Sequence, residues 1–313
     1  MTTKAPLAID KTITLDINGS RQSIRLCAAR AGLPPLLIVQ GGPGLPLLHE
    51  VPKFQRLLNL EKDFLVGYWE QRGCGNASQN DAQSVSLPQQ VDDLRTVLRW
   101  LHAETRQRVL MFGISWGATI VLQAVEHESG RVTSVVGISP DLQTTSSDAA
   151  TYAFLQEQAL RADRRQVGGR VMKLGRPPYV DLAEFQRRAR LLADLGTIER
   201  EKSFNGLLRE LLFNLIRTYG LVGGVRALRN MNTVQRKLLP EIAALDLLAH
   251  PPRVTVPVHY VFGKQDALTS VSVVTELPAA MAAPNSTVFR VPDAGHMVHF
   301  DQPQVVRSIV EKA

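Results

Sequence analysis

Short apolar runs and amphipathic segments alternate along the first part of the chain and return near its end. The apolar runs have the length and the Val, Ile, Leu and aromatic content of β-strands. They predict strands at 12–17, 22–27, 35–40, 64–69, 108–113, 132–138, 257–263 and 286–291. Apolar positions that favour one face of a helix predict helices at 91–101, 116–126, 271–282 and 303–312. This alternation indicates an α/β fold, with a mostly parallel central sheet flanked by helices.

The alternation stops near Pro140 and resumes near Pro257. The intervening segments are helix-like and rich in Leu, Arg, Ala and Gln, such as LAEFQRRARLLADL and SFNGLLRELLFNLIRTYG. At 313 residues the chain exceeds the size at which single cores begin to acquire a second lobe. We therefore expect an α/β core formed by residues 1–140 and 251–313, with a helical cap inserted at 141–250.

The composition is ordinary for a globular protein, with 44% hydrophobic and 21% charged residues. The net charge is +7, but acidic residues are interspersed and no basic run is present, so nucleic-acid binding is not indicated. The N-terminus lacks the apolar core of a signal peptide, and no stretch approaches the roughly 18 apolar residues of a membrane helix. We therefore expect a cytoplasmic protein without a membrane partner.

The two cysteines, Cys27 and Cys74, are too few for a disulfide framework, and we expect reduced thiols. Cys74 lies between Gly73 and Gly75, where it fills a tight turn as a small residue; a reactive thiol is the alternative interpretation. No Cys or His cluster has the spacing of metal ligands. Neither a metal site nor a cofactor is predicted.

The sequence GISWGA at 113–118 places Ser115 between a predicted strand and a predicted helix. In this context the flanking glycines of a GxSxG motif allow a strained turn that exposes the serine hydroxyl at the carboxyl end of the sheet. A helix that begins directly behind the serine also brings backbone N–H groups close to developing negative charge. Because a serine hydroxyl is a weak nucleophile alone, the hypothesis requires a base and an acid downstream.

Both groups are present in the order that this chemistry predicts. Asp266 and His296 each follow a predicted strand, in the loops GKQDALT and PDAGHMVHF. The carboxyl ends of parallel strands form the ligand crevice of an α/β sheet, so we expect the two side chains to lie near Ser115. We interpret His296 as the base and Asp266 as the acid that orients it. The alternatives are His299 for the base and Asp293 for the acid.

The third requirement is a pair of backbone N–H groups for the oxyanion. Trp116, directly after the nucleophile, is expected to supply one of them. The second is expected from QGGPG at 40–44, where Pro43 has no N–H and Gly42 is the predicted donor. An ordinary tight turn is the alternative interpretation of these glycines.

Taken together, five motifs resemble the proline iminopeptidase group of the α/β-hydrolase fold family. They are QGGPG (40–44), EQRGCGNAS (70–78), GISWG (113–117), GKQDAL (263–268) and AGHMVHF (294–300). The resemblance implies a serine hydrolase that removes an N-terminal residue, often proline, with cap carboxylates holding the free amine. Glu157 and Glu184, on predicted cap helices, are the candidates for that role.

The sequence departs from the family where specificity would be encoded. The usual HGGPG begins here with Gln40, and the usual DQRG begins with Glu70. The segment GISPDLQTTSSD lacks the arginine that the peptidases tend to carry there. The leading hypothesis is a cofactor-independent serine hydrolase of a small-molecule or short-peptide substrate, in its most specific form a proline iminopeptidase-like aminopeptidase. A carboxylesterase or lactonase with the same triad, and a ligand-binding protein on the same fold, are the alternatives.

Overall fold

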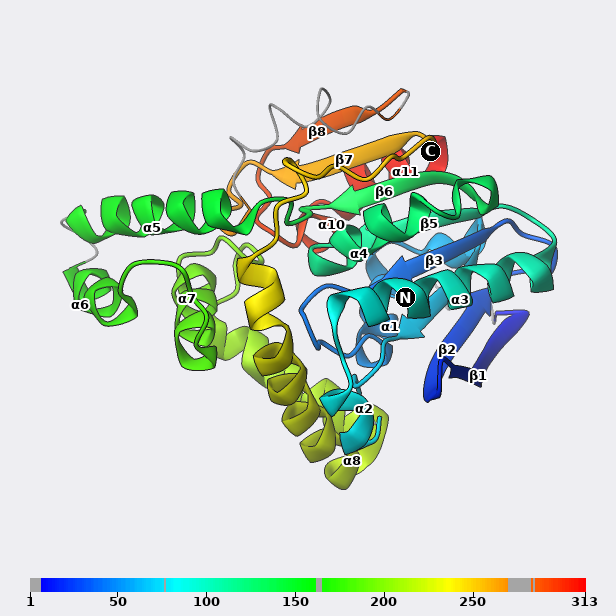
Figure 1. Ribbon diagram of the computed structural model, residues 1–313, viewed down its shortest axis with the longest axis horizontal. Helices are drawn as coiled ribbons and strands as arrows, with labels where there is room; N and C mark the ends of the chain where they lie inside the picture. Colours follow the sequence, from blue (N-terminus) through cyan, green and yellow to red (C-terminus); the bar gives the residue numbers. More distant parts are fainter. Residues whose placement is uncertain (1–6, 76, 162–164, 270–282, 284) are drawn as a thin grey trace, which may run out of the picture.

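The computed structural model describes residues 7–75, 77–161, 165–269, 283 and 285–313. Its centre is one eight-stranded sheet in the order β1-β2-β4-β3-β5-β6-β7-β8 (Figure 1). β2 pairs antiparallel with β1 and with β4, and all other pairs are parallel. The strands are β1 (Ile9–Ile17), β2 (Ser20–Ala28), β3 (Pro35–Val39), β4 (Leu65–Glu70), β5 (Val109–Ile114), β6 (Val132–Ile138), β7 (Val258–Gly263) and β8 (Thr287–Val291). All eight predicted strands are confirmed, with small shifts at their ends.

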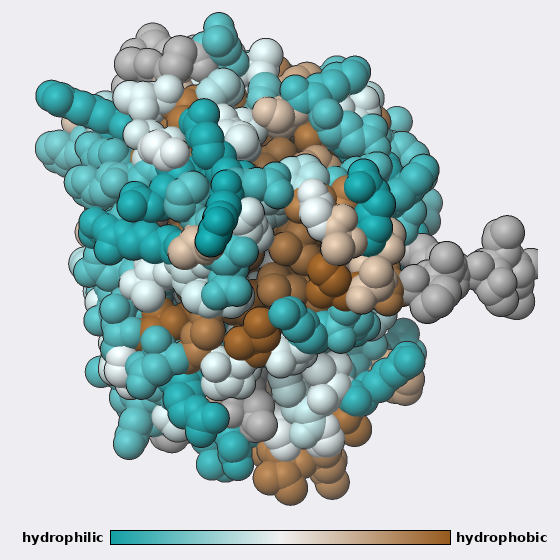
Figure 2. All heavy atoms as spheres, turned by 90° about the vertical axis from the view of Figure 1, so that its right-hand side faces the viewer, coloured by the Kyte–Doolittle hydropathy of each residue, from teal (hydrophilic) through white to brown (hydrophobic). Residues whose placement is uncertain are grey.

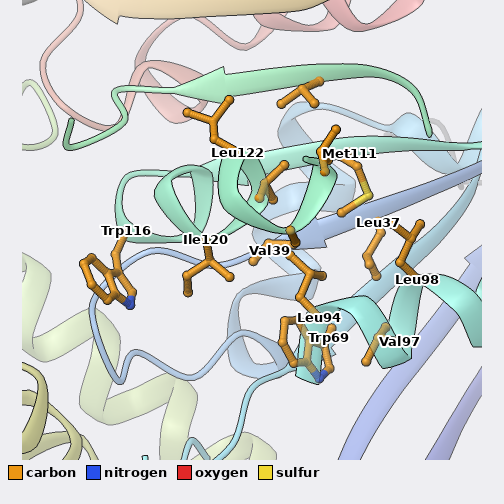
Figure 3. Packing of buried hydrophobic residues seen from close by; sticks show 14 of the residues in the cluster. Leu37, Val39, Trp69, Leu94, Val97, Leu98, Met111, Trp116, Ile120 and Leu122 are labelled. Carbon is orange, nitrogen blue, oxygen red and sulfur yellow. The ribbon is translucent and has the colours of Figure 1, made fainter. Parts of the chain in front are cut away.

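Helices cover both faces of the sheet. They are α1 (Val51–Leu57), α3 (Leu87–Thr105), α4 (Trp116–Val125), α10 (Val298–Asp301) and α11 (Pro303–Lys312). Leu37 and Val39 of β3 pack in one apolar cluster with side chains of α3 and α4 (Figure 3). Leu36 and Ile38 face the other way and pack with α1 and α11. Because both faces are covered, β3 is buried along its whole length, as expected for a central parallel strand.

The predicted helices at 91–101, 116–126 and 303–312 are confirmed by α3, α4 and α11, whereas the helix predicted at 271–282 lies outside the described residues. α3 begins after Ser86, whose hydroxyl accepts the N–H of Gln89 at 3.3 Å, as an N-cap residue does. The remaining short elements are α2 (Gln79–Gln83) and 3₁₀ turns at Leu48–Glu50, Leu60–Lys62 and Ser129–Arg131.

Among the described residues between β6 and β7, four helices extend beyond the sheet (Figure 1). They are α5 (Thr144–Leu160), α6 (Arg165–Leu174), α7 (Leu182–Asp194) and α8 (Phe204–Ala243). Leu155, Val171, Tyr179 and Leu192 belong to a separate apolar cluster within this segment. The helical content predicted for this segment is therefore present, and the division into a core and a cap stays a prediction.

α8 changes direction at Gly220, whose φ of 72° and ψ of 175° are not helical. Glycine adopts this left-handed φ without the strain that a side chain would cause. Phe213, Leu221 and Val222, on either side of the kink, are exposed. Figure 2 shows apolar atoms at the lower end of the molecule, the end at which Figure 1 places the bend of α8.

The two cysteines are unpaired and buried, which confirms the expected free thiols. Gly73 and Gly75 have φ values of 71° and 55°, so Cys74 lies in the tight turn predicted for it. Burial raises the pKa of the Cys74 thiol well above its usual value, and the nearby Glu70 raises it further. The thiol therefore stays protonated, which disfavours a reactive role. In the described part of the chain, no helix has the length and apolar character needed to cross a bilayer.

Candidate active site

Ser115 lies at the turn between β5 and α4, in a backbone conformation that few residues other than glycine adopt. Its φ is 50° and its ψ is −121°. A Cβ atom on Gly113 would lie 2.5 Å from the Cα of Ala118, and one on Gly117 would lie 2.2 Å from the carbonyl oxygen of Val39. Both glycines of the motif are therefore required by close backbone packing. This packing keeps the turn tight and the serine at the carboxyl end of the sheet.

His296 and Asp266 are brought together by the loops after β8 and β7. His296 Nδ1 lies 2.9 Å from Asp266 Oδ2, and both side chains are buried. Asp266 also accepts the backbone N–H groups of Leu268 and Thr269, at 2.8 and 3.1 Å. Burial would raise the pKa of Asp266, but the charge of His296 and these hydrogen bonds outweigh it and lower that pKa. Asp266 is therefore ionised and holds the imidazole ring in a fixed orientation.

The two alternative residues lie in environments unsuited to proton transfer. His299 is fully buried, its ring stacks on Phe54 with centroids 5.4 Å apart, and neither ring nitrogen has a hydrogen-bond partner among the residues described. Burial, reinforced by Lys53 and His296, lowers the pKa of His299 well below its usual value. Asp293 is exposed with a φ of 51°, and its carbonyl oxygen accepts a hydrogen bond from Gln302. The geometry thus brings together the pair favoured by the sequence rather than either alternative.

An inner cavity of about 460 Å³ opens in front of Ser115 and His296. Gln40, Gly41 and Gly42 from the loop after β3 form its wall beside the serine. The opposite wall comes from α7 and α8 and is mainly apolar, including Phe185, Ala189, Leu207, Leu208, Leu211 and Met231. Asp266 is not among the lining residues and lies behind His296. The cavity therefore joins the serine and the histidine to a largely apolar binding space.

The glycines near Ser115 differ in their contacts. A Cβ atom on Gly41 would lie 3.1 Å from the Cβ of Ser115 and 2.9 Å from the carbonyl oxygen of Ile114. A Cβ atom on Gly42 would instead meet the backbone nitrogens of Gly44 and Leu45. Gly41 is thus the glycine that contacts the serine, and the sequence interpretation did not consider it as an oxyanion donor. The assignment of Gly42 stays a prediction.

Trp116 opens α4, so its backbone N–H is one of the first in the helix and has no partner in the preceding turn. Its side chain is buried away from the cavity, and the indole N–H donates to Gln90 Oε1 at 2.9 Å. Any contact between Trp116 and a ligand in the inner cavity therefore involves the backbone and not the indole ring.

Neither of the cap glutamates chosen from the sequence lies on the cavity wall. Glu157 is exposed on α5. Glu184 is in the first turn of α7, where Asp181 accepts its backbone N–H at 3.3 Å, and its side chain is not among the lining residues. The residues that line the cavity from this helix begin at Phe185 and recur at helical spacing, so Glu184 lies on another face of α7. The cavity lining therefore does not support these two glutamates, and their role in substrate binding stays a prediction.

Three other carboxylates line the inner cavity: Glu50, Glu199 and Glu210. Lys53 Nζ lies 2.8 Å from Glu199 and 3.3 Å from Glu210, and Lys202 pairs with the same two glutamates. Isolated glutamates in helices and turns carry no motif, and this is why the sequence analysis missed them. One signal in the sequence was Gln40, which stands where the family motif usually has histidine. Its amide donates to Glu50 Oε2 at 2.7 Å and so points to this carboxylate.

Glu50 is the least compensated of the three carboxylates. Burial raises its pKa to about 7, although Lys53 and the hydrogen bond from Gln40 act in the opposite direction. At neutral pH, Glu50 is therefore protonated in about half of the protein molecules. A cationic ligand in the cavity would favour the ionised form.

The EQRG motif at 70–73 supports the loop that lines the cavity. Glu70 accepts the N–H of Leu47 at 2.6 Å and the hydroxyl of Tyr219 on α8. Gln71 donates to the carbonyl oxygen of Gln40 at 2.8 Å. Arg72 forms a buried two-point ion pair with Asp93, at 2.7 and 3.0 Å. The longer Glu70 therefore connects the loop after β3 to α8 by hydrogen bonds.

The α/β-hydrolase fold family model matches residues 34–303, which is most of the chain. The chain belongs to the α/β-hydrolase fold family. A curated relative from Bacillus subtilis (strain 168), named probable aminopeptidase YbaC, is 22% identical over 99% of this chain and 97% of its own length. The sheet order and the sites after β5, β7 and β8 agree with this membership.

Two solved structures extend the comparison. A proline iminopeptidase-related protein from Thermus thermophilus has a TM-score of 0.63 at 17% identity, covering 97% of this chain and 96% of its own. The proline iminopeptidase of Mycobacterium smegmatis has a TM-score of 0.66 at 16% identity, covering 96% and 97%. At these identities the likeness shows the fold, and hydrolase relatives support an enzyme of the same broad class.

Proposed function

We propose that this protein is a serine hydrolase that cleaves a small amide or ester bond through an acyl-enzyme on Ser115. The observation that carries the proposal is the strained Ser115 turn, which lines the same cavity as His296, whose ring is bound to Asp266 at 2.9 Å. This is the set of groups that nucleophilic acyl transfer requires.

In the first half of the reaction, His296 takes the proton from Ser115 Oγ as that oxygen attacks the substrate carbonyl. Asp266 stabilises the imidazolium that forms. The backbone N–H of Trp116, with that of Gly41 or Gly42, stabilises the oxyanion. His296 then protonates the leaving group. A water molecule, activated by the same histidine, releases the acyl group and regenerates the serine.

The most specific form of the proposal is a proline iminopeptidase-like aminopeptidase that acts on short peptides; one of the similar solved structures is named a proline iminopeptidase. Helices α5–α8 then form the cap. Glu50, the one of the three cavity carboxylates without a paired lysine, supports a substrate with a free ammonium group, which would supply the counter-charge that it lacks. The apolar side chains of α7 and α8 suit a small ring such as that of proline.

A carboxylesterase or lactonase is the second candidate. Glu199 and Glu210 are already paired with Lys53 and Lys202, which leaves a cavity whose charges are largely balanced. Such a cavity suits a neutral ester as well as an amine.

Labelling with a fluorophosphonate probe, together with assays of a prolyl arylamide and of short acyl esters, tests these proposals. We expect labelling that disappears in Ser115→Ala and persists in Ser23→Ala, a serine on β2 that is not among the residues of the inner cavity. Preferred cleavage of the arylamide supports the aminopeptidase. Turnover of esters alone supports the second candidate. A folded wild-type protein that does not label contradicts the serine hydrolase and favours a ligand-binding protein.

A further inference from the structure

A second, outer cavity of about 730 Å³ adjoins the inner one. Four residues line both cavities: His49, Lys53, Glu210 and Asn214. The outer cavity lies between β2, α1 and the first half of α8. These four residues form the boundary between the two cavities.

The outer cavity is lined by five basic side chains and one carboxylate. The basic residues are Arg25, Lys53, Arg56, Lys202 and Arg217, and the carboxylate is Glu210. Three of the basic groups are already neutralised. Arg25 pairs with Asp10, and both lysines pair with Glu199 and Glu210.

Arg56 and Arg217 are the exceptions. No ion pair or hydrogen bond joins either guanidinium to any residue that the structure describes. They come from α1 and α8, which are far apart in sequence, yet they line one cavity. Two unpaired cations on opposite elements of one concave surface create a positive potential that a bound anion would relieve.

His49 is one of the residues shared by the two cavities, and it is uncharged. Its side chain is 5% exposed, and its Nδ1 has no hydrogen-bond partner within the described part of the chain. Burial lowers the pKa of His49 to about 4, so its ring is neutral and adds no positive charge to the outer cavity. The positive charge of the outer cavity that has no partner therefore comes from Arg56 and Arg217.

We propose that the outer cavity binds an anionic group, a carboxylate or a phosphate, at the far end of the substrate, through Arg56 and Arg217. This proposal rests on the proposed function in placing the scissile bond at Ser115. It adds that the preferred substrates carry a negative charge beyond that bond. The inner cavity then selects the reacting end, and the outer cavity selects the charged end.

The binding test uses Ser115→Ala protein, which needs no turnover. Isothermal titration calorimetry with inorganic phosphate and with glutarate, at matched ionic strength, distinguishes the two sources of anion. We expect millimolar or tighter binding of at least one anion, weakened about tenfold or more by Arg56→Ala combined with Arg217→Ala. Arg236→Ala is the matched control, because Arg236 is also an exposed arginine on α8 but lines neither cavity.

A kinetic test uses two isosteric substrates, prolyl-glutamate amide and prolyl-glutamine amide. The wild type is expected to prefer the glutamate substrate in kcat/KM, and the double variant to lose that preference through KM. Equal anion binding in the wild-type background, the double variant and the control overturns the proposal, as does the absence of millimolar binding of either anion. If anions bind as expected but neither peptide is cleaved, the aminopeptidase assignment fails and the anion site remains.

Discussion

The two walls of the inner cavity differ in how the chain specifies them. The sheet-side wall, formed by Gly41, Ser115 and His296, depends on backbone conformation and on glycines that no larger residue can replace. The helix-side wall, from α7 and α8, depends on side chains such as Phe185 and Leu207. Many apolar residues fill such positions at little cost. The proposed chemistry therefore rests on a few backbone turns, whereas the proposed choice of substrate rests on replaceable side chains.

The two walls meet at the backbone next to His296. The N–H of His296 donates to the carbonyl oxygen of Thr197, and the N–H of Met297 donates to that of Ile198, both at 2.8 Å. A Cβ atom on Gly295 would lie 2.6 Å from the same Thr197 oxygen. The segment between α7 and α8 therefore positions the loop that carries His296. A displacement of these helices would also move the histidine.

The largest expected effect comes from Asp266→Asn on the sheet side. An amide cannot stabilise the imidazolium and favours the wrong tautomer of His296, so we expect kcat to fall by about 10⁴-fold. The fold should persist, because asparagine can still accept the N–H groups of Leu268 and Thr269. Steady-state kinetics on the preferred substrate and circular dichroism measure the two effects.

Asp293→Asn is the matched control, since Asp293 lies on the same side of the fold in an exposed turn before His296. We expect its kcat to stay within a factor of about two of the wild type. Near-full activity in Asp266→Asn would show that another carboxylate orients the histidine. The assignment of the reacting groups to the sheet-side wall would then be wrong.

The same division explains what could be predicted from the sequence. Strands β3 and β5 are buried on both faces and appear as continuous apolar runs, so the sheet was predictable. Ser115 and Asp266 follow strands of this kind, whereas His296 follows the partly exposed edge strand β8. The carboxylates of the cavity were not predictable, because Glu50, Glu199 and Glu210 converge only through tertiary packing. Helical periodicity places Glu157 on α5 but does not say which face of that helix meets the cavity.

A smaller effect is expected on stability and belongs to Glu50. Burial raises the pKa of Glu50 to about 7, above its ordinary 4.5, so the folded state favours the protonated form. Its contribution to the free energy of unfolding is present below pH 4.5 and is lost as the pH rises through about 7. The loss amounts to roughly 3–4 kcal/mol, because each pKa unit corresponds to roughly 1.4 kcal/mol.

Glu50→Gln keeps an oxygen that accepts the hydrogen bond from Gln40 but cannot ionise. Relative to the wild type, its free energy of unfolding should therefore increase between about pH 5 and pH 8, as measured by urea denaturation at each pH. Glu157→Gln, at an exposed position on α5, is expected to show no such trend. A difference between Glu50→Gln and the wild type that does not change with pH would show that Glu50 is not buried as a carboxyl group.

The smallest expected effect concerns substrate selection by the same side chain. If Glu50 receives the substrate ammonium, Glu50→Gln should lower the preference for a prolyl arylamide over cyclopentanecarbonyl arylamide, which lacks the amine. A hydrogen bond to a charged group contributes about 1.5–3 kcal/mol, so the ratio of the two kcat/KM values should fall about tenfold or more. The change should lie mainly in KM, because the ammonium is bound before and during the reaction. The same ratio in Glu157→Gln should match the wild type. A ratio that falls in Glu157→Gln and not in Glu50→Gln would show that the exposed face of α5 binds the substrate amine. Substrate selection by the wall of the inner cavity would then be contradicted.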